Sequence, residues 1–149
     1  MAARFSYLMF LIVLVAFCGC STAKYINFRK ATHVFLRNEI GSGVVLNYHC
    51  QSKDDDLGNR TLAYDEEWEW EFKTSIWFNT LFWCRMDWWD DINKVQIRGA
   101  FDIYYGLRDI EVCHRHCYRT ATYDGVYDSY SREPYLVWRQ PKRLRQSTN

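Results

Sequence analysis

Residues 68–72 read Trp68-Glu69-Trp70-Glu71-Phe72, and this strict alternation decides the fold class. Successive side chains of a β-strand point to opposite faces, so the three aromatic rings share one face and both Glu point to water. The segment therefore predicts a half-buried strand with one face in a hydrophobic core.

Short runs of β-branched and aromatic residues lie on both sides of this strand, while helical periodicity is weak. We predict further strands at 32–38, 44–50, 76–84, 101–105, 110–118 and 135–138. Seven or eight short strands without intervening helices predict an all-β chain, folded as a small antiparallel two-sheet β-sandwich. A small closed barrel is the alternative.

Length and composition agree with one packed domain. The chain has 149 residues with 7 Trp, 11 Tyr and 9 Phe, but only 7 Gly and 2 Pro. So many aromatic residues exclude a disordered chain, and so few Gly and Pro exclude collagen-like or low-complexity classes.

The N-terminus has the pattern of an export signal. Arg4 is followed by an apolar run over 5–17 and then by the small residues Ser21-Thr22-Ala23. The run is shorter than the roughly 20 apolar residues that span a bilayer, which argues against an uncleaved membrane anchor. We predict a signal peptide at 1–23, removed after Ala23, and a secreted domain at 24–138.

The last eleven residues, 139–149, are basic. They contain Arg139, Lys142, Arg143 and Arg145 and no acidic residue, whereas residues 24–138 hold 14 basic and 18 acidic side chains. We expect a disordered, solvated tail. The alternative is a segment that contacts anionic membrane or cell-wall polymer.

Four cysteines follow the predicted leader: Cys50, Cys84, Cys113 and Cys117. An even number in an exported chain predicts two disulfides. We expect Cys113 and Cys117 each to pair with a distant partner, Cys50 or Cys84, and both such pairings stay open.

The histidines invite a search for catalysis or metal binding. A secreted ribonuclease would use two His as acid and base, but His33, His49, His114 and His116 stand in no recognisable catalytic context. The segment from Cys113 to Cys117 matches no common zinc pattern, so we expect no metal there.

The polar run Asp54-Asp55-Asp56-Leu57-Gly58 has the carboxylates of a calcium ligand set, but not the spacing of a calcium loop. A turn, in which Asp side chains bond their own backbone, is favoured. Asn59-Arg60-Thr61 directly after it is an acceptor site for N-glycosylation.

Other enzyme classes find little support. Glu69 and Glu71 have the residue type of a glycosidase pair, but solvated charges opposite a core face are the favoured interpretation. Trp88-Trp89 is either an exposed contact pair or packing at a strand end, and we favour packing. There is no nucleophile elbow and no phosphate loop. We therefore expect no enzyme, no cofactor and no nucleic-acid partner.

Several motifs resemble the plant self-incompatibility S-protein family. His49-Cys50-Gln51-Ser52-Lys53-Asp54-Asp55-Asp56-Leu57-Gly58 is similar to the family's core motif, and Trp68–Phe72, Thr80–Cys84, Cys113–Cys117 and Asp124–Tyr127 are similar to later motifs in the same order. One departure is the polar stretch 118–122, which we expect to be an edge strand or to be locally repacked.

The resemblance implies a disulfide-linked, secreted, non-enzymatic β-sandwich that acts as a ligand in cell–cell recognition, as in rejection of self pollen. It also implies a structural role for the Asp-rich run. We expect contact loops at 51–64, 87–93 and 124–133 and a plant cell-surface receptor as partner. The alternative is a secreted defence or cell-wall and lipid-binding protein that uses its basic tail and exposed aromatic residues.

Overall fold

The computed structural model describes residues 31–130 and 136–138. Within these residues the elements follow in the order β1 (Thr32–Asn38), β2 (Leu46–Gln51), β3 (Asp56–Leu62), β4 (Glu67–Phe72), β5 (Leu81–Asp90), β6 (Val95–Tyr105), α2 (Gly106–Asp109), β7 (His116–Ala121), β8 (Gly125–Asp128) and β9 (Leu136–Val137).

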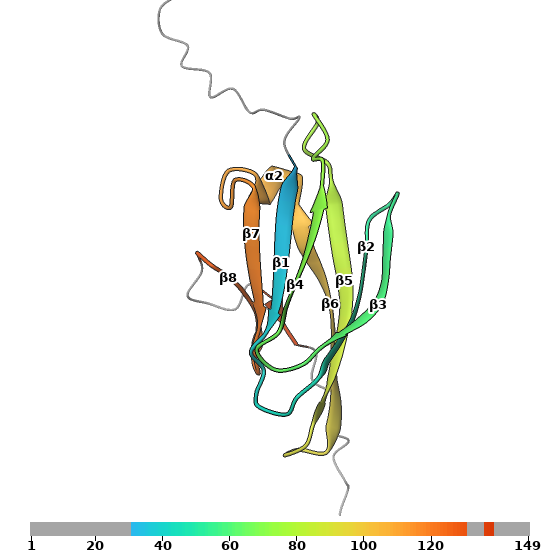
Figure 1. Ribbon diagram of the computed structural model, residues 1–149, viewed down its shortest axis with the longest axis vertical. Coiled ribbons are helices and arrows are strands. Elements are labelled where there is room, and N and C mark those ends of the chain that lie inside the picture. The colour runs from blue at the N-terminus through green and yellow to red at the C-terminus, as the bar shows by residue number, and fades with distance from the viewer. Residues whose placement is uncertain (1–30, 131–135, 139–149) are drawn as a thin grey trace, which may run out of the picture.

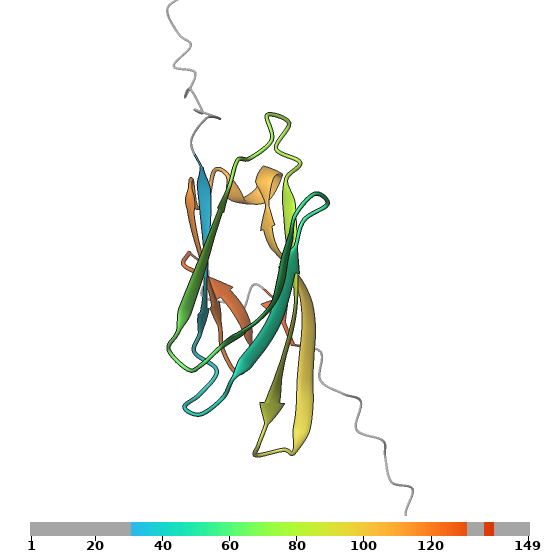
Figure 2. The same cartoon turned by 45° about the vertical axis from the view of Figure 1, so that its right-hand side comes forward.

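The strands form two facing sheets, as predicted (Figures 1 and 2). A five-stranded sheet has the order β4-β1-β7-β8-β9, and a four-stranded sheet has the order β3-β2-β5-β6. Side chains from the inner faces of both sheets make one continuous core. The all-β sandwich is therefore confirmed, and the closed barrel is not adopted.

The alternating segment behaves as its sequence predicts. In β4 the indole of Trp70 is buried, and Trp68 and Phe72 pack against the core, while Glu69 and Glu71 are exposed. Such burial of large aromatic side chains is a main source of stability in small domains.

One strand pair departs from the antiparallel pattern. β1 pairs antiparallel with β4 but parallel with β7, with His33 opposite His116 and Asn38 opposite Ala121. A parallel pair needs a long crossover, and here the chain between β1 and β7 includes the whole four-stranded sheet. Short-range alternation carries no information about such a distant pairing.

The strand predicted at 76–84 begins later and runs further. Ile76 and Trp77 lie in a turn and are 61% and 76% exposed, and β5 starts at Leu81. The turn is fixed by polar groups, because Ser75 N donates to Thr80 Oγ1 at 2.8 Å. The apolar residues before Leu81 therefore do not indicate a strand.

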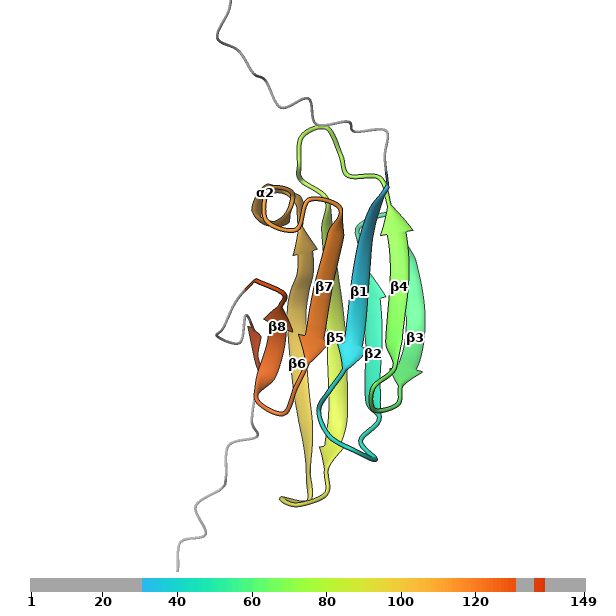
Figure 3. The same ribbon diagram turned by 60° about the vertical axis from the view of Figure 1, so that its left-hand side comes forward.

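The strand predicted at 110–118 is also wrong in its first half. The chain leaves β6 through the short helix α2 and then turns, and β7 begins only at His116 (Figure 3). The Asp109 carboxylate accepts a hydrogen bond from Tyr105 N at 2.8 Å, and Cys113 N donates to Asp109 O at 2.9 Å. These bonds satisfy the backbone in a helical turn instead of a strand.

The polar stretch 118–122 is not an edge strand, so the first of the two alternatives given for it is wrong. β7 lies inside the sheet, between β1 and β8. Its polarity has a specific cause, because Arg119 is buried at 2% exposure and pairs with the buried Asp109. A charge that has a partner in the core satisfies the rule that buried charges are paired.

Candidate functional site

The outer face of the five-stranded sheet carries aromatic rings where a solvent-facing sheet usually carries polar side chains. Alternation along β1 turns His33 and Phe35 outward. The parallel register places His33 beside His116 and Phe35 beside Tyr118. We call these four side chains the aromatic face.

The rings of the aromatic face are stacked across the two strands. The centroids of His33 and His116 lie 5.3 Å apart with an interplanar angle of 7°, and those of Phe35 and Tyr118 lie 4.5 Å apart at 15°. Stacked pairs of this kind add about 0.5–1.5 kcal/mol beyond burial. Because each ring supports its neighbour, the face is ordered before any partner binds.

A row of carboxylates borders these rings. Glu67, Glu69 and Glu71 point outward from β4, and we call them the acidic row. His33 Nδ1 lies 2.5 Å from Glu69 Oε1, and His33 Nε2 lies 4.0 Å from Glu71 Oε2. The side chains of Glu69 and Glu71 remain 48% and 70% exposed, so the row can still accept cationic partners.

The nearby arginine is already engaged. The Arg37 guanidinium pairs with Asp65, and its Nε lies 3.1 Å from Glu39 Oε1. The hydrogen bond with Asp65 is the main reason why the pKa of Arg37 is raised. The surface around the aromatic face is therefore acidic overall.

This geometry favours recognition over phosphate chemistry. His33 and His116 do meet, which sequence reasoning missed because the pairing of β1 with β7 was not readable. A ribonuclease, however, needs cations around a phosphate, and here the substrate would meet three carboxylates. Ring faces and carboxylates together suit a basic, partly apolar surface.

The cysteines pair differently from the expectation. Cys50 is bonded to Cys84, its direct neighbour in the register of β2 and β5, and Cys113 is bonded to Cys117. The crossed pairings are wrong because α2 and its turn bring Cys113 and Cys117 to a Cα separation of 5.0 Å. His114 has φ of 53°, which lets the chain reverse between them.

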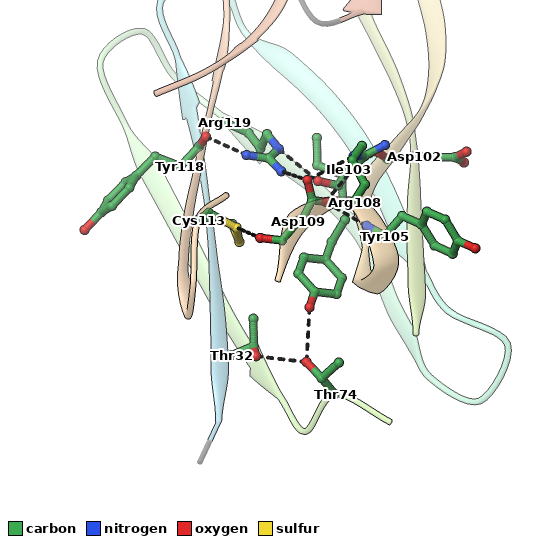
Figure 4. Close-up of a disulfide and its surroundings, with 12 residues drawn as sticks. Thr32, Thr74, Asp102, Ile103, Tyr105, Arg108, Asp109, Cys113, Tyr118 and Arg119 are labelled. Atoms are coloured by element: carbon green, nitrogen blue, oxygen red, sulfur yellow. Dashed lines mark hydrogen bonds and ion pairs between the residues drawn. A yellow bond between two sulfur atoms is a disulfide. The ribbon is translucent and has the colours of Figure 1, made fainter. Parts of the chain in front are cut away.

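A buried ion pair sits beside this turn (Figure 4). Arg119 reaches from β7 to Asp109 at the end of α2, with 3.0 Å between its nitrogen and the carboxylate, and its Nε donates to Ile103 O at 3.0 Å. Arg108 binds the other carboxylate oxygen at 2.7 Å. Burial lowers the pKa of Arg119, and Asp109 opposes that effect. The pair joins the two sheets next to the disulfide.

The Asp-rich run forms a turn followed by a strand. Ser52 Oγ accepts bonds from the backbone N–H groups of Asp54 and Asp55, at 3.2 and 2.9 Å. Asp56 Oδ1 accepts Gly58 N at 2.8 Å and lies 2.6 Å from His49 Nε2. The hydrogen bond with His49 is the main reason why the pKa of Asp56 is lowered. The expectation that this run, with Leu57, is structural and binds no metal stays a prediction.

Asn59 lies on the edge strand β3 and is exposed on the outer face of its sheet, opposite His49. Its side chain is therefore open to modification. It also lines a hollow shared with Arg85 and Asp87. Glycosylation at Asn59 stays a prediction.

The two tryptophans predicted as a pair point to opposite faces. Trp88 is buried at 2% exposure, whereas Trp89 is 48% exposed on the outer face. The expected contact loops are in part strands, because 51–64 contains β3, 87–93 contains the end of β5 and 124–133 contains β8. The backbone of these segments pairs with neighbouring strands, and their polar composition does not indicate that pairing.

Some predictions concern residues outside those that the structure describes. The leader at 1–23, the tail at 139–149 and the end of the third predicted loop belong to them. Among the described residues, no helix is long and apolar enough to cross a membrane.

Comparison with known proteins agrees with this architecture. Residues 33–139 match the family model described as plant self-incompatibility protein S1. S-protein homolog 3 of Arabidopsis thaliana is 36% identical over 109 residues, covering 73% of this chain and 69% of the relative. S-protein homolog 19 of the same plant is 33% identical, covering 73% of this chain and 77% of the relative.

A solved structure supports the fold. It is described as one of the self-incompatibility protein homologues, a widespread family of small, highly stable, secreted plant proteins. It aligns with a TM-score of 0.54 and 20% identity, covering 74% of this chain and 96% of that one. Motifs, fold and family match together show that this chain belongs to the plant self-incompatibility S1 family, the S-protein homologues.

Proposed function

We propose that this chain is a secreted, non-catalytic ligand that binds a cell-surface protein on another plant cell. The response would be rejection of self pollen or a related cell–cell signal. Family membership supports the proposal, as does the description of the solved relative as secreted. The predicted leader at 1–23 supports secretion independently.

The observation that carries the proposal is the aromatic face with its acidic row. Protein interfaces are enriched in aromatic side chains, which bury much area at low entropic cost. Tyr118 is 44% exposed although it stacks on Phe35, so it offers both a ring and a hydroxyl to a partner. The surface lies on strands, and its shape is therefore held by the backbone.

Charge complementarity supports a particular kind of partner. The acidic row places three carboxylates along one exposed edge strand, beside rings that attract cations through their faces. We infer that the receptor contributes a segment with Lys or Arg beside apolar residues. Opposite charges of this kind also increase the rate of association.

Saturable binding to cells tests the proposal. Labelled, oxidised protein is added to protoplasts and to pollen, and is displaced by unlabelled protein. Tyr118→Ser should weaken binding at least about tenfold, as at a hot spot. Trp77→Ser is the control, because Trp77 is an aromatic residue that is 76% exposed in the turn between β4 and β5, outside the expected contact loops. Glu71→Lys should also weaken binding, and Glu111→Lys should not.

Two results would contradict the proposal. One is saturable binding that neither Tyr118→Ser nor Glu71→Lys changes, which would place the contact elsewhere. The other is binding that survives treatment of the cells with trypsin, which would mean that the partner is not a surface protein.

A further inference from the structure

The outer face of the four-stranded sheet is hollowed, and the proposed receptor contact does not use it. One hollow of about 480 Å³ crosses β3, β2 and β5, and a second of about 500 Å³ lies between the turn before β2 and the end of β5. Both are lined by Asn47, so they adjoin. We call the two together the sheet groove.

The first hollow holds cationic groups. Arg85 points outward from β5, opposite His49, and is exposed. Its guanidinium has no hydrogen-bond or ion-pair partner among residues 31–130 and 136–138. Arg60 on the neighbouring edge strand is held in place, because its guanidinium lies 4.5 Å above the Trp68 ring and its Nε donates to Leu57 O. The first hollow therefore offers one open guanidinium fork for an anion.

The Asp87 carboxylate, which lines the first hollow, is a hydrogen-bond acceptor in a fixed position. Asp87 Oδ2 accepts hydrogen bonds from Asn47 Nδ2 at 3.1 Å and from Gln96 Nε2 at 2.6 Å. Two amides therefore position the carboxylate, while its Oδ1 accepts no hydrogen bond from residues 31–130 and 136–138. A ligand hydroxyl can donate to it, whereas a second anion would be repelled.

The second hollow has an apolar wall. Trp89 and Val45 both line it and are each 48% exposed. The side chain of Trp89 also hydrogen-bonds Asp91, whose pKa is lowered mainly by Lys94 and additionally by this bond. The half-exposed indole is therefore available as an apolar contact for a ligand.

We propose that the sheet groove binds an acidic oligosaccharide. A uronate carboxylate binds the Arg85 guanidinium, hydroxyl groups bind Asp87 and Asn47, and the C–H face of a sugar ring lies on Trp89. A guanidinium binds a carboxylate through two parallel hydrogen bonds. Arg85 and Trp89 are four residues apart on one strand, about 13 Å, which calls for several linked sugars.

The mixture of charges argues for a sugar and against a nucleic acid. Asp87 lies two residues from Arg85 on the same face, and Asp91 lines the second hollow. A polyanion with a charge on every unit would meet these carboxylates. An oligosaccharide has one carboxylate on a uronate and hydroxyls elsewhere, which matches one cation flanked by acceptors.

Binding of acidic xylo-oligosaccharides, which carry a single uronate on a neutral sugar chain, tests the proposal by calorimetry on the full protein, secreted from plant cells, at physiological ionic strength. Arg85→Gln should raise the Kd at least about tenfold, since it removes the charged fork. Arg98→Gln is the matched control, because Arg98 has the same charge on the same sheet face but lines neither hollow. Trp89→Ala should also weaken binding, and Trp77→Ala should not.

Three outcomes would overturn the proposal. Equal losses in the Arg85 and Arg98 variants would show unspecific attraction. Binding that is lost when the four basic residues of the tail are changed to Gln, and is untouched by Arg85→Gln, would place it in residues 139–149. Single-stranded DNA that binds as tightly, with the same sensitivity to Arg85→Gln, would make nucleic acid the ligand.

Glycosylation at Asn59 gives a fourth outcome that would overturn the proposal. Asn59 lines the first hollow, so a sugar chain attached there competes for the same space. If the secreted protein fails to bind and an Asn59→Gln variant binds, the groove is covered by the chain's own glycan and has no external ligand. Tyr118→Ser should leave oligosaccharide binding unchanged, which separates this test from that of the receptor contact.

Discussion

Arg119 shows how one residue can hold two sheets together. It is buried at 2% exposure on β7 and meets Asp109, which follows β6 in the chain. Two charges in a core are costly to desolvate, so the pair depends on its hydrogen bonds to remain favourable. The Ile103 carbonyl and Arg108 supply these bonds.

Arg119→Met should therefore lower the free energy of unfolding by about 3 kcal/mol, because it leaves the buried Asp109 carboxylate with Arg108 as its remaining cationic partner. Unfolding in guanidinium, followed by tryptophan fluorescence, measures this. Arg37→Met is the control, since Arg37 pairs with carboxylates at the surface, and its effect should be much smaller. Equal effects would mean that the buried pair has no special role.

Asp90 is the second residue with a distinct environment. It is 3% exposed and accepts bonds from the N–H groups of Ile92 and Asn93, from the Asn93 amide and from the Tyr123 hydroxyl. The bonds from Asn93 are the main cause that lowers its pKa from 3.8 to about 2. Tyr123 belongs to the turn after β7, so Asp90 also links the two sheets.

The stabilisation that Asp90 provides should depend on pH. The folded-state pKa is below the unfolded value, so the stabilisation is complete above about pH 4 and is lost as the pH falls through about 2. Thermal unfolding is measured at several pH values between 5 and 2. The difference in Tm between wild type and Asp90→Asn should shrink as the pH falls. Tyr123→Phe, which removes one donor, should give a smaller version of the same trend. A difference that stays constant with pH would contradict this assignment.

At the scale of elements, the two disulfides have different tasks. Cys50–Cys84 joins neighbouring strands of one sheet and closes a loop with a sequence separation of 34, whereas Cys113–Cys117 spans 4. In the chain-entropy model these loops correspond to about 4 and about 2 kcal/mol. The first bridge stabilises the fold, and the second shapes the turn that leads into β7.

Replacing each pair by Ala separates the two tasks. The free energy of unfolding should fall about twice as far for Cys50→Ala with Cys84→Ala as for Cys113→Ala with Cys117→Ala, and denaturant titration measures both. All four sulfurs are buried, so the cavities that are left are comparable. A larger loss from the second pair would show that the turn depends on its bridge for its conformation.

At the scale of the whole molecule, the sequence was informative wherever one residue's environment depends on near neighbours. The alternation in β4 indicated both its strand and its buried face, and the full extent of β1 was read correctly. The same local reasoning failed at Ile76 and Trp77, which are apolar but lie in an exposed turn fixed by side-chain hydrogen bonds.

Features that depend on contacts between residues far apart in the chain could not be predicted from the sequence. His33 and His116 were both candidates, yet only the parallel register of β1 and β7 brings them together. The sheet groove likewise requires the order β3-β2-β5 before Asn59, His49 and Arg85 become neighbours. The pairing of Cys113 with Cys117 depends on α2, whose four residues are too few to give a periodic pattern.

The parallel pairing of β1 and β7 has a consequence for biosynthesis. β1 is among the first folded segments to leave the ribosome, and one of its edges stays open until β7 follows more than eighty residues later. An unpaired strand edge invites association with other nascent chains. β4 can cover the other edge of β1 early, so the five-stranded sheet stays incomplete during synthesis, and its open edge is the side of β1 at which a wrong strand pairing would start.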